Sequence, residues 1–231
     1  MALYKLQRKV KIRWSPNFAY AIGLISSDGW LDQNERHIGF ASKDIELVEN
    51  FKKAFLLTNK ITKSVGSGTS NRKYFVIKFG DKVFYKFLNK IGLTKAKSKT
   101  IKSVIIPDKF FADFTRGLFD GDGSFYSYWD KRWPKSFGYK LSFASASLNF
   151  IEWLKNRLTQ LYGVKGYIHK GDGVFNLEYV KGDSRRLFEN MYYNKDILYL
   201  TRKYKKIKSA LKKDNIFGVN YLQVHQNAGL A

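Results

Sequence analysis

The chain has 231 residues, of which 44% are hydrophobic, and its 42 Lys and Arg residues against 19 Asp and Glu residues give a formal net charge of +23. This length and hydrophobic content suffice for a core of normal size, and the excess of positive charge favours a polyanionic partner. The absence of cysteine excludes disulfides and thiolate zinc sites, and three widely separated histidines disfavour a histidine metal centre, so a catalytic metal would need oxygen ligands.

The distribution of apolar and basic residues bears on location and partner. No apolar run approaches the ~18 residues that span a bilayer, and Met1–Arg13 lacks the apolar segment of a secretory signal. We therefore expect an intracellular, soluble protein of the cytoplasm, nucleoid or organelle matrix that is not secreted and binds no membrane. The basic residues are spread through both halves among 15 Tyr, 5 Trp and 19 Phe rather than gathered on one amphipathic helix, which favours nucleic acid.

Two short segments, Ala21–Gly29 (AIGLISSDG) and Thr115–Gly123 (TRGLFDGDG), share one pattern. Each predicts an apolar helix that contains a glycine, Gly23 or Gly117, and ends at an Asp-Gly pair. A glycine inside a helix costs about 1 kcal/mol relative to alanine, and a carboxylate at a helix C-terminus faces the negative end of the helix dipole. Two features that oppose stability, repeated at matched positions, indicate function.

The elements that follow each motif come in the same order. After the first motif the sequence predicts a hairpin with a strand at 37–42, a helix over 44–57, a strand at 61–65, a Gly/Ser-rich turn at 66–71, a strand at 74–79 and a helix over 83–91. The second half predicts a motif helix from residue 110, strands at 124–129 and 136–144, a helix over 148–162, strands at 164–169 and 173–180, and a helix over 185–192. We therefore expect an α+β fold of two pseudo-symmetric αββαββα repeats, at residues 1–98 and 109–231, with a connector at 99–108.

The predicted strands alternate in a way that leaves one face of each sheet polar. In 137–144, large apolar residues occupy the odd positions, and small or basic residues occupy the even positions. This alternation is equally typical of an ordinary antiparallel sheet with one face in solvent, but the charge favours a groove for nucleic acid. Basic, polar and aromatic side chains on these strands and turns are candidate DNA contacts: Gln33, Asn34, Arg36, Arg72, Lys73, Lys78, Tyr126, Tyr128, Lys131, Arg132 and Lys140.

The two motif aspartates suggest metal chemistry. If the motif helices pack together through their glycines, Asp28 and Asp122 meet at the helix ends, where their charges repel unless divalent cations neutralise them. The carbonyls of Ser27 and Gly121 could complete Mg²⁺ sites, and such a site can activate water for phosphodiester cleavage. A single Asp-Gly pair is more often only a helix-ending turn, whereas two matched copies in a basic chain favour the metal site.

Both motifs, the repeat layout and the basic, aromatic composition resemble a monomeric LAGLIDADG homing endonuclease over nearly the whole chain. The resemblance implies a saddle-shaped sheet from each repeat in the DNA major groove, the motif helices at the repeat interface, and a break in both strands. It also implies that Asp28 and Asp122 bind two or more Mg²⁺ ions, for which Ca²⁺ or Mn²⁺ can substitute, assisted by the carbonyls of Ser27 and Gly121. We expect a monomer that acts on double-stranded DNA without a protein partner.

The resemblance further implies a basic residue near each scissile phosphate, after the third helix of each repeat. Lys97 and Lys203 fit that position, although a lysine there is equally typical of a phosphate-binding surface. Polar residues that open the second helix often position active-site water in the family, which indicates Ser42 and Ser145, where this chain lacks the usual Gln or Asn. We expect Asp120, whose counterpart in the first repeat is a serine, to make local hydrogen bonds rather than bind metal.

Alternatives from a different class use the same fold without cleavage, as an intron maturase or a DNA-binding regulator. Asp28 and Asp122 argue against a regulator, which tends to lose at least one acid and to carry an added helix-turn-helix domain. A maturase remains open, since one protein can have both activities. Because the ends of the sequence lack the nucleophiles of protein splicing, we expect a free-standing, intron-encoded protein rather than a nuclease embedded in an intein.

Overall fold

The computed structural model describes residues 8–65, 73–133 and 136–227. The first repeat contains α1 (Pro16–Asp28), β1 (Gly29–Leu31), β2 (His37–Ser42), α2 (Ile45–Ala54), β3 (Thr62–Val65), β4 (Lys73–Gly80) and α3 (Lys82–Lys90). The second contains α5 (Phe111–Asp122), β5 (Ser124–Trp129), β6 (Phe137–Ser145), α6 (Leu148–Tyr162), β7 (Tyr167–Lys170), β8 (Phe175–Val180) and α7 (Lys181–Met191). Between and after them lie α4 (Lys97–Thr100), the short 3₁₀ helix η1 (Asp108–Phe110) and α8 (Thr201–Asn227).

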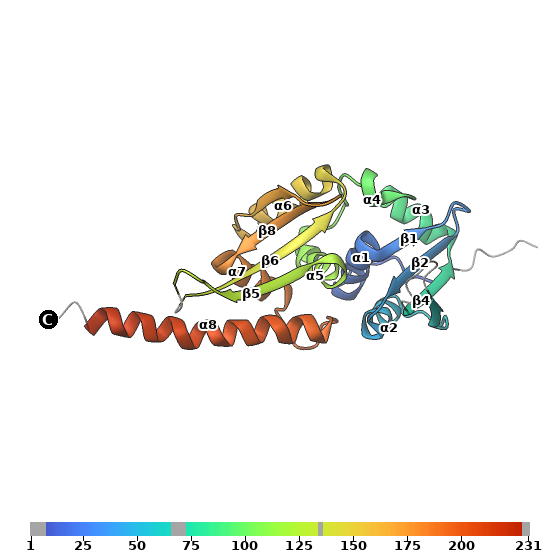
Figure 1. The fold of residues 1–231 in the computed structure, drawn as a ribbon. Coiled ribbons are helices and arrows are strands. Elements are labelled where there is room, and N and C mark those ends of the chain that lie inside the picture. The colour runs from blue at the N-terminus through green and yellow to red at the C-terminus, as the bar shows by residue number, and fades with distance from the viewer. Residues whose placement is uncertain (1–7, 66–72, 134–135, 228–231) are drawn as a thin grey trace, which may run out of the picture.

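The two repeats have the same topology. Their antiparallel sheets have the strand orders β1-β2-β4-β3 and β5-β6-β8-β7, and α1 and α5 lie side by side between them (Figure 1). The expected α+β fold of two αββαββα repeats is therefore confirmed. The described part of the chain contains no helix that is both long enough and apolar enough to cross a membrane.

The contact between α1 and α5 requires its glycines. A Cβ atom on Gly23 would lie 2.2 Å from the carbonyl oxygen of Phe114, and one on Gly117 would lie 2.1 Å from that of Tyr20. All residues from Phe18 to Ile25 are buried, so α1 is enclosed on every side, which explains its uniformly apolar sequence. Close backbone approach, rather than helix propensity, accounts for glycine inside both helices.

Several element boundaries differ from the sequence prediction. The helix expected over 44–57 ends at Ala54, because Leu56 takes a left-handed φ of 53°. The strand expected at 164–169 begins only at Tyr167; Val164 is fully buried, so its hydrophobicity reflects packing in the core. The 27-residue helix α8 was not expected at all. The turn predicted at 66–71 lies outside the described residues.

Candidate active site

The C-terminal ends of α1 and α5 bring two carboxylates to one place. Asp28 and Asp122 are the last residues of these helices, and a Cβ atom on Gly121 of α5 would lie 2.8 Å from Oδ2 of Asp28. Burial, and secondarily the charge of Asp122, raises the pKa of Asp28 to about 7. The side chain of Asp122 is more exposed to solvent, and partial burial at the helix end raises its pKa as well.

Two buried lysines contact the same helix ends. Lys97 Nζ donates to the carbonyl oxygen of Gly29 at 2.5 Å and approaches that of Ser27 at 3.5 Å. Lys203 Nζ donates to the equivalent carbonyls of the second repeat, Gly121 at 3.0 Å and Gly123 at 2.6 Å, and to that of Phe119 at 2.6 Å. Each ammonium group thus lies at the negative end of a motif helix, where its charge is favourable.

The environment of the lysines lowers their affinity for protons. Lys97 is 5% exposed and Lys203 is 8% exposed, and burial lowers the pKa of each to about 8 against the opposing effect of nearby carboxylates. Both lysines are therefore mainly protonated at neutral pH. The site as a whole contains two carboxylates and two ammonium groups related by the pseudo-symmetry of the repeats.

Each lysine segment is held by the second helix of the opposite repeat. Ser147, the N-cap of α6, donates its hydroxyl to the carbonyl of Ile101, which follows α4. In the first repeat, the N-cap position of α2 is Asp44, which binds Arg202 at 2.7 Å beside Lys203. The repeats are consequently interlocked at both lysines.

Asp120 is buried and hydrogen-bonded within the protein. Its carboxylate is 1% exposed and accepts hydrogen bonds from the hydroxyl of Tyr20 at 2.9 Å, the hydroxyl of Tyr192 at 3.0 Å and the backbone N–H of Leu200 at 2.7 Å. Burial raises its pKa. The structure agrees with the expected hydrogen-bonding role, and these contacts fix the segment that leads into Lys203.

Arg116, inside the second motif, was not singled out from the sequence. It is fully buried, forms an ion pair with Asp113 at 2.8 Å, and donates to the carbonyls of Met191 at 2.7 Å and Leu198 at 2.8 Å. Arg116 therefore attaches α5 to the segment between α7 and α8. The feature of the sequence that could have identified it is an arginine that lies in an apolar helix, three residues after Asp113.

Ser42 and Ser145 occupy equivalent turns at the ends of β2 and β6. The hydroxyl oxygen of Ser42 accepts from the N–H of Asp44 at 3.2 Å, and that of Ser145 accepts from the N–H of Ser147 at 3.1 Å. Ser145 and Asp122 line the same small cavity. Both serines shape the entry into the second helix, and Ser145 also lies near Asp122.

The donor set fits a hard divalent cation. Within the described residues no group of three or more His, Cys, Asp and Glu side chains could hold a metal ion. A cation between Asp28 and Asp122 would therefore complete its shell with carbonyl, water or phosphate oxygens, as Mg²⁺ and Ca²⁺ commonly do. The carbonyls of Ser27 and Gly121 each receive a lysine contact and retain a second lone pair.

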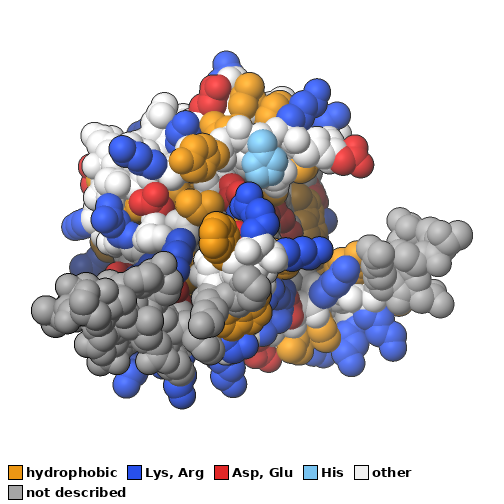
Figure 2. All heavy atoms as spheres, turned by 60° about the vertical axis from the view of Figure 1, so that its left-hand side comes forward, with side chains coloured by type: hydrophobic (Ala, Val, Ile, Leu, Met, Phe, Trp, Pro, Cys, Tyr) orange, Lys and Arg blue, Asp and Glu red, His pale blue; other side chains and the backbone are white. Residues whose placement is uncertain are grey.

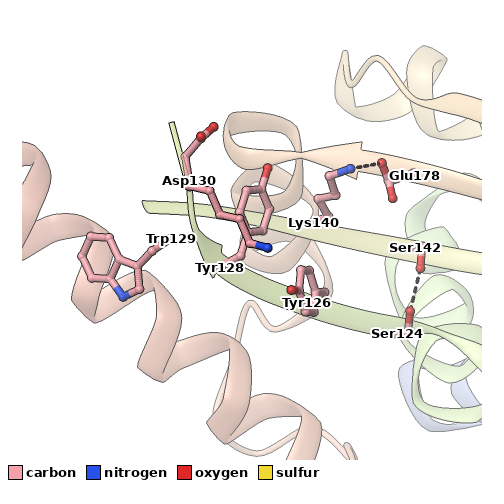
Figure 3. A pocket seen from close by; sticks show the side chains of 9 residues that line it. Ser124, Tyr126, Tyr128, Trp129, Asp130, Lys140, Ser142 and Glu178 are labelled. Carbon is pink, nitrogen blue, oxygen red and sulfur yellow. Dashed lines mark hydrogen bonds and ion pairs between the residues drawn. The ribbon is translucent and has the colours of Figure 1, made fainter. Parts of the chain in front are cut away.

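The polar face of the second sheet forms a groove. It has a volume of about 540 Å³ and is lined from β5, β6 and β8 by residues that include Tyr126, Tyr128 and Lys140 (Figure 3). The two tyrosine rings stack at 5.6 Å, and Lys140 pairs with Glu178 at 2.8 Å. On the first sheet, Lys78 of β4 forms an ion pair with Asp32 at 2.5 Å.

The remaining candidate DNA contacts lie on turns and strand ends. Gln33, Asn34 and Arg36 are exposed in the β1–β2 turn, where the side-chain oxygen of Asn34 accepts from the N–H of Arg36 at 3.1 Å. Lys131 and Arg132 are exposed in the β5–β6 turn. Figure 2 shows that Lys and Arg side chains are spread over the face it presents and outnumber Asp and Glu.

The candidate contact Lys73, at the start of β4, does not lie on the polar face of the first sheet. Lys73 is exposed, but the alternation of the strand places it on the side of Ile77 and Phe79, opposite Tyr74 and Lys78. Arg72 lies outside the described residues.

Comparison with known proteins gave one family and several solved structures of similar fold. A LAGLIDADG-like domain model matches residues 15–92 and again residues 110–192. The LAGLIDADG meganuclease I-AabMI bound to uncleaved DNA superimposes with a TM-score of 0.60 at 14% identity, over 90% of this chain and 92% of that chain. Full-length DUF199/WhiA from Thermatoga maritima gives 0.55 at 16% identity, over 96% and 71%. I-DmoI in complex with DNA and Ca gives 0.51 at 17% identity, over 78% and 91%.

At these identities the solved structures show a shared fold. The search of curated protein sequences gave no match.

Proposed function

The chain belongs to the LAGLIDADG-like domain family, with two repeats in one polypeptide, and on that premise we propose that it is a site-specific DNA endonuclease. It makes a double-strand break in a long recognition site by metal-dependent hydrolysis of one phosphodiester in each strand. The observation that carries the proposal is the convergence of Asp28 and Asp122, each beside a buried lysine, at the interface of the two motif helices.

Asp28 and Asp122 are the proposed metal ligands, assisted by the carbonyls of Ser27 and Gly121. Divalent cations bound there would polarise the scissile phosphates and lower the pKa of a water nucleophile. The raised pKa of Asp28 supports this assignment, because a carboxylate pair that resists ionisation is stabilised when a cation binds. Mg²⁺ is the proposed cation, and the likeness to I-DmoI in complex with DNA and Ca supports a divalent cation as the cofactor.

Lys97 and Lys203 are the proposed positive charges beside the scissile phosphates. Their hydrogen bonds to the helix-end carbonyls hold each ammonium group in place, so that it can counter the negative charge that develops on phosphate oxygens in the transition state. Because one lysine belongs to each repeat, each is assigned to one DNA strand.

The polar sheet faces are the proposed DNA-binding surface. Aromatic and basic side chains of the groove that contains Tyr126, Tyr128 and Lys140 would contact base edges and phosphates of duplex DNA. The likeness to I-AabMI bound to uncleaved DNA supports DNA as the partner. Since both halves of the site lie in one chain, the protein needs no partner and is proposed to act as a monomer.

A second candidate is a nucleic-acid-binding protein that does not cleave, such as an intron maturase or a DNA-binding regulator. The specific observation that favours it is the likeness to DUF199/WhiA, a protein with a LAGLIDADG domain whose name does not describe a nuclease; its TM-score of 0.55 is close to the 0.60 of I-AabMI. The fold alone therefore does not separate the two candidates, whereas the carboxylate pair favours cleavage.

Cleavage of a randomised duplex library in Mg²⁺ separates the candidates. The endonuclease proposal expects double-strand breaks within one sequence motif for the wild type and for a control variant of the exposed loop residue, Asp172→Asn. It expects no breaks for Asp28→Asn or Asp122→Asn, which should still bind the selected site in Ca²⁺. Specific binding without breaks by the wild type, with every divalent cation tried, would support the second candidate instead.

A further inference from the structure

Lys140 and Glu178 lie side by side on the polar face of the second sheet. On β6 and β8 the even-numbered residues point to the side opposite the buried Leu141 and Leu177. The ammonium group of Lys140 donates to Oε1 of Glu178 at 2.8 Å across the two strands, inside the groove that Figure 3 shows. The pair therefore lies on the face that meets the DNA duplex under the proposed function.

Both side chains of this pair keep free hydrogen-bonding capacity. The side chain of Lys140 is 35% exposed and that of Glu178 is 24% exposed. An ammonium group has three N–H donors, and Glu178 uses one of them. Within the described residues no other polar atom binds Lys140 Nζ or Oε2 of Glu178. Two donors and one acceptor oxygen are consequently available in the groove.

An acid on this face needs an explanation. Glu178 repels phosphate, so it weakens the attraction between a chain of charge +23 and a polyanion. The other acid that lines the groove, Asp130, follows the end of β5 and lies in the β5–β6 turn. Glu178 is therefore the acid that a strand of this groove presents with a free oxygen. A contact with a base edge gives such an oxygen a partner that phosphate cannot provide.

A G·C base pair presents the complementary pattern in the major groove. Guanine offers two acceptors, N7 and O6, and cytosine offers the donor N4–H₂. O6 and N4 are hydrogen-bonded to each other at about 2.9 Å, which is close to the 2.8 Å between Lys140 Nζ and the carboxylate of Glu178. The lysine can therefore donate to N7 and O6 while the carboxylate accepts from N4.

The other base pairs match this donor and acceptor pattern less well. In A·T, the donor N6–H₂ of adenine replaces guanine O6 and meets the ammonium group. In T·A, the thymine methyl group replaces guanine N7, so one hydrogen bond is lost. In C·G, the donor N4–H₂ meets the ammonium group and the acceptor O6 meets the carboxylate. The pattern thus selects both the identity and the orientation of the base pair.

We propose that Lys140 and Glu178 together read one G·C base pair, in a fixed orientation, within the half of the recognition site that the second repeat covers. The proposal rests on the proposed function for the placement of duplex DNA on the polar face. The first sheet has no equivalent reader among its described residues, because each oxygen of Asp32 already has a partner, Trp30 Nε1 at 2.9 Å or Lys78 at 2.5 Å.

The test compares two double variants that each remove one positive and one negative charge. Lys140→Met/Glu178→Met removes the pair. Lys155→Met/Glu152→Met, the control, removes a lysine and a glutamate from α6, which packs on the buried side of the same sheet. Folding is checked by circular dichroism and thermal unfolding. Sites are selected from a randomised duplex library by binding in Ca²⁺, and the affinity for each of the four base pairs is then measured at every selected position.

The wild type and the α6 variant should prefer G·C at one position by about 10-fold, and loss of the pair should reduce that preference below about 3-fold without changing other positions. Because the net charge is unchanged, both double variants should bind a duplex of arbitrary sequence like the wild type at every salt concentration. Glu178→Met alone is the second variant of the pair. It should weaken the G·C preference while binding the arbitrary duplex more tightly, since an acid is removed.

Equal weakening for every sequence would show that the pair only supports the sheet, and a loss of preference for A·T, or at several positions, would also overturn the proposal. If the wild type cleaves specific sites and both double variants keep its preferences, the reading assignment fails and the endonuclease proposal stands. If no cleavage is found but loss of the pair alone removes the G·C preference, the assignment stands and the endonuclease proposal fails. Absence of sequence-specific duplex binding would overturn both.

Discussion

Ser27 and Gly121 occupy equivalent positions in the two motifs and face each other across the interface between α1 and α5. A Cβ atom on Gly121 would lie 2.0 Å from the hydroxyl oxygen of Ser27 and 2.8 Å from Oδ2 of Asp28. The pseudo-symmetry axis therefore has room for one side chain at this level. The two motifs therefore differ at this position, with serine in the first and glycine in the second, because the packing leaves space for only one of the two side chains. This difference lies directly beside the candidate metal ligands.

Gly121→Ala should destabilise the protein by on the order of 2 kcal/mol or more through this overlap, and should reduce cleavage by displacing Asp28. Ser27→Gly in the same chain should restore part of the loss, because it frees the space that the new methyl group needs. Thermal unfolding of the two single variants and the double variant measures the coupling. Strictly additive effects of the two changes would show that these residues do not share the space.

Gly117→Ala should be more damaging, since its Cβ atom would lie 2.1 Å from the backbone oxygen of Tyr20, and backbone cannot move aside cheaply. We expect a loss of on the order of 3 kcal/mol and lower cleavage even where the protein remains folded. The control is Gly182→Ala near the start of α7, where a new Cβ would meet nothing within 4 Å. Similar unfolding temperatures for both variants would contradict the close packing of the motif helices.

Asp28→Asn should stabilise the protein in EDTA at pH 8 by roughly 2 kcal/mol. The pKa of Asp28 is about 7 in the folded protein against an ordinary value of 3.8, so the folded state binds more protons between these values. Its contribution to stability therefore falls as pH rises from about 4 to 7, and the advantage of the variant should grow over that range. Denaturant unfolding of both proteins at pH 4.5 and 8 measures this, with Asp172→Asn as the control.

Mg²⁺ should reverse that order at pH 8, because the cation would bind the wild-type carboxylate pair and not the amide. An advantage of Asp28→Asn that is the same at both pH values, or a wild type whose stability does not respond to any divalent cation, would contradict the assignment of this pair.

Lys97→Met and Lys203→Met should slow cleavage of opposite strands. Each lysine contacts the helix end of its own repeat, so its loss should leave the other half of the site largely intact and produce nicked intermediates. Strand-specific end labelling under single-turnover conditions reports the two rates, and a loss on the order of 10²-fold on one strand is expected. Equal slowing of both strands by each variant would count against one lysine per strand.

Arg116→Met should cost about 3–5 kcal/mol, because it leaves Asp113 buried without its partner. The double variant Arg116→Met/Asp113→Leu should recover much of that stability, since neither charge is then buried alone. Chemical unfolding of the three variants tests this. A double variant no more stable than Arg116→Met would show that the contacts of Arg116 with Met191 and Leu198 dominate.

The sequence supported the prediction of the fold because the motif appears twice and the elements after it repeat in order. The alternation in 137–144 matches the burial of β6 residue by residue. Within the site, the motif glycines anticipated the contact of α1 with α5. The family resemblance, and not the residues alone, pointed to Lys97 and Lys203, whose ammonium groups both reach the helix ends.

Long-range polar contacts could not be read from the sequence. The pairs Asp120 with Leu200 and Asp44 with Arg202 join residues 80 and 158 positions apart, and no local pattern specifies them. Helix α8 was missed because its lysines obscure the apolar spacing of Ile207 and Leu211. The ion pairs of Lys78 and Lys140 likewise depend on the tertiary structure. They show that these two candidate DNA contacts already have acidic partners.

The most direct test of the carboxylate pair is strand-resolved cleavage of the selected duplex in Mg²⁺ by the wild type, Asp28→Asn and Asp122→Asn, with each protein shown to bind that duplex in Ca²⁺. A shared metal site predicts that the wild type cuts both strands and that either substitution reduces double-strand breaks by at least about 10²-fold while binding persists. Cleavage by either variant at the wild-type rate on both strands would contradict the account.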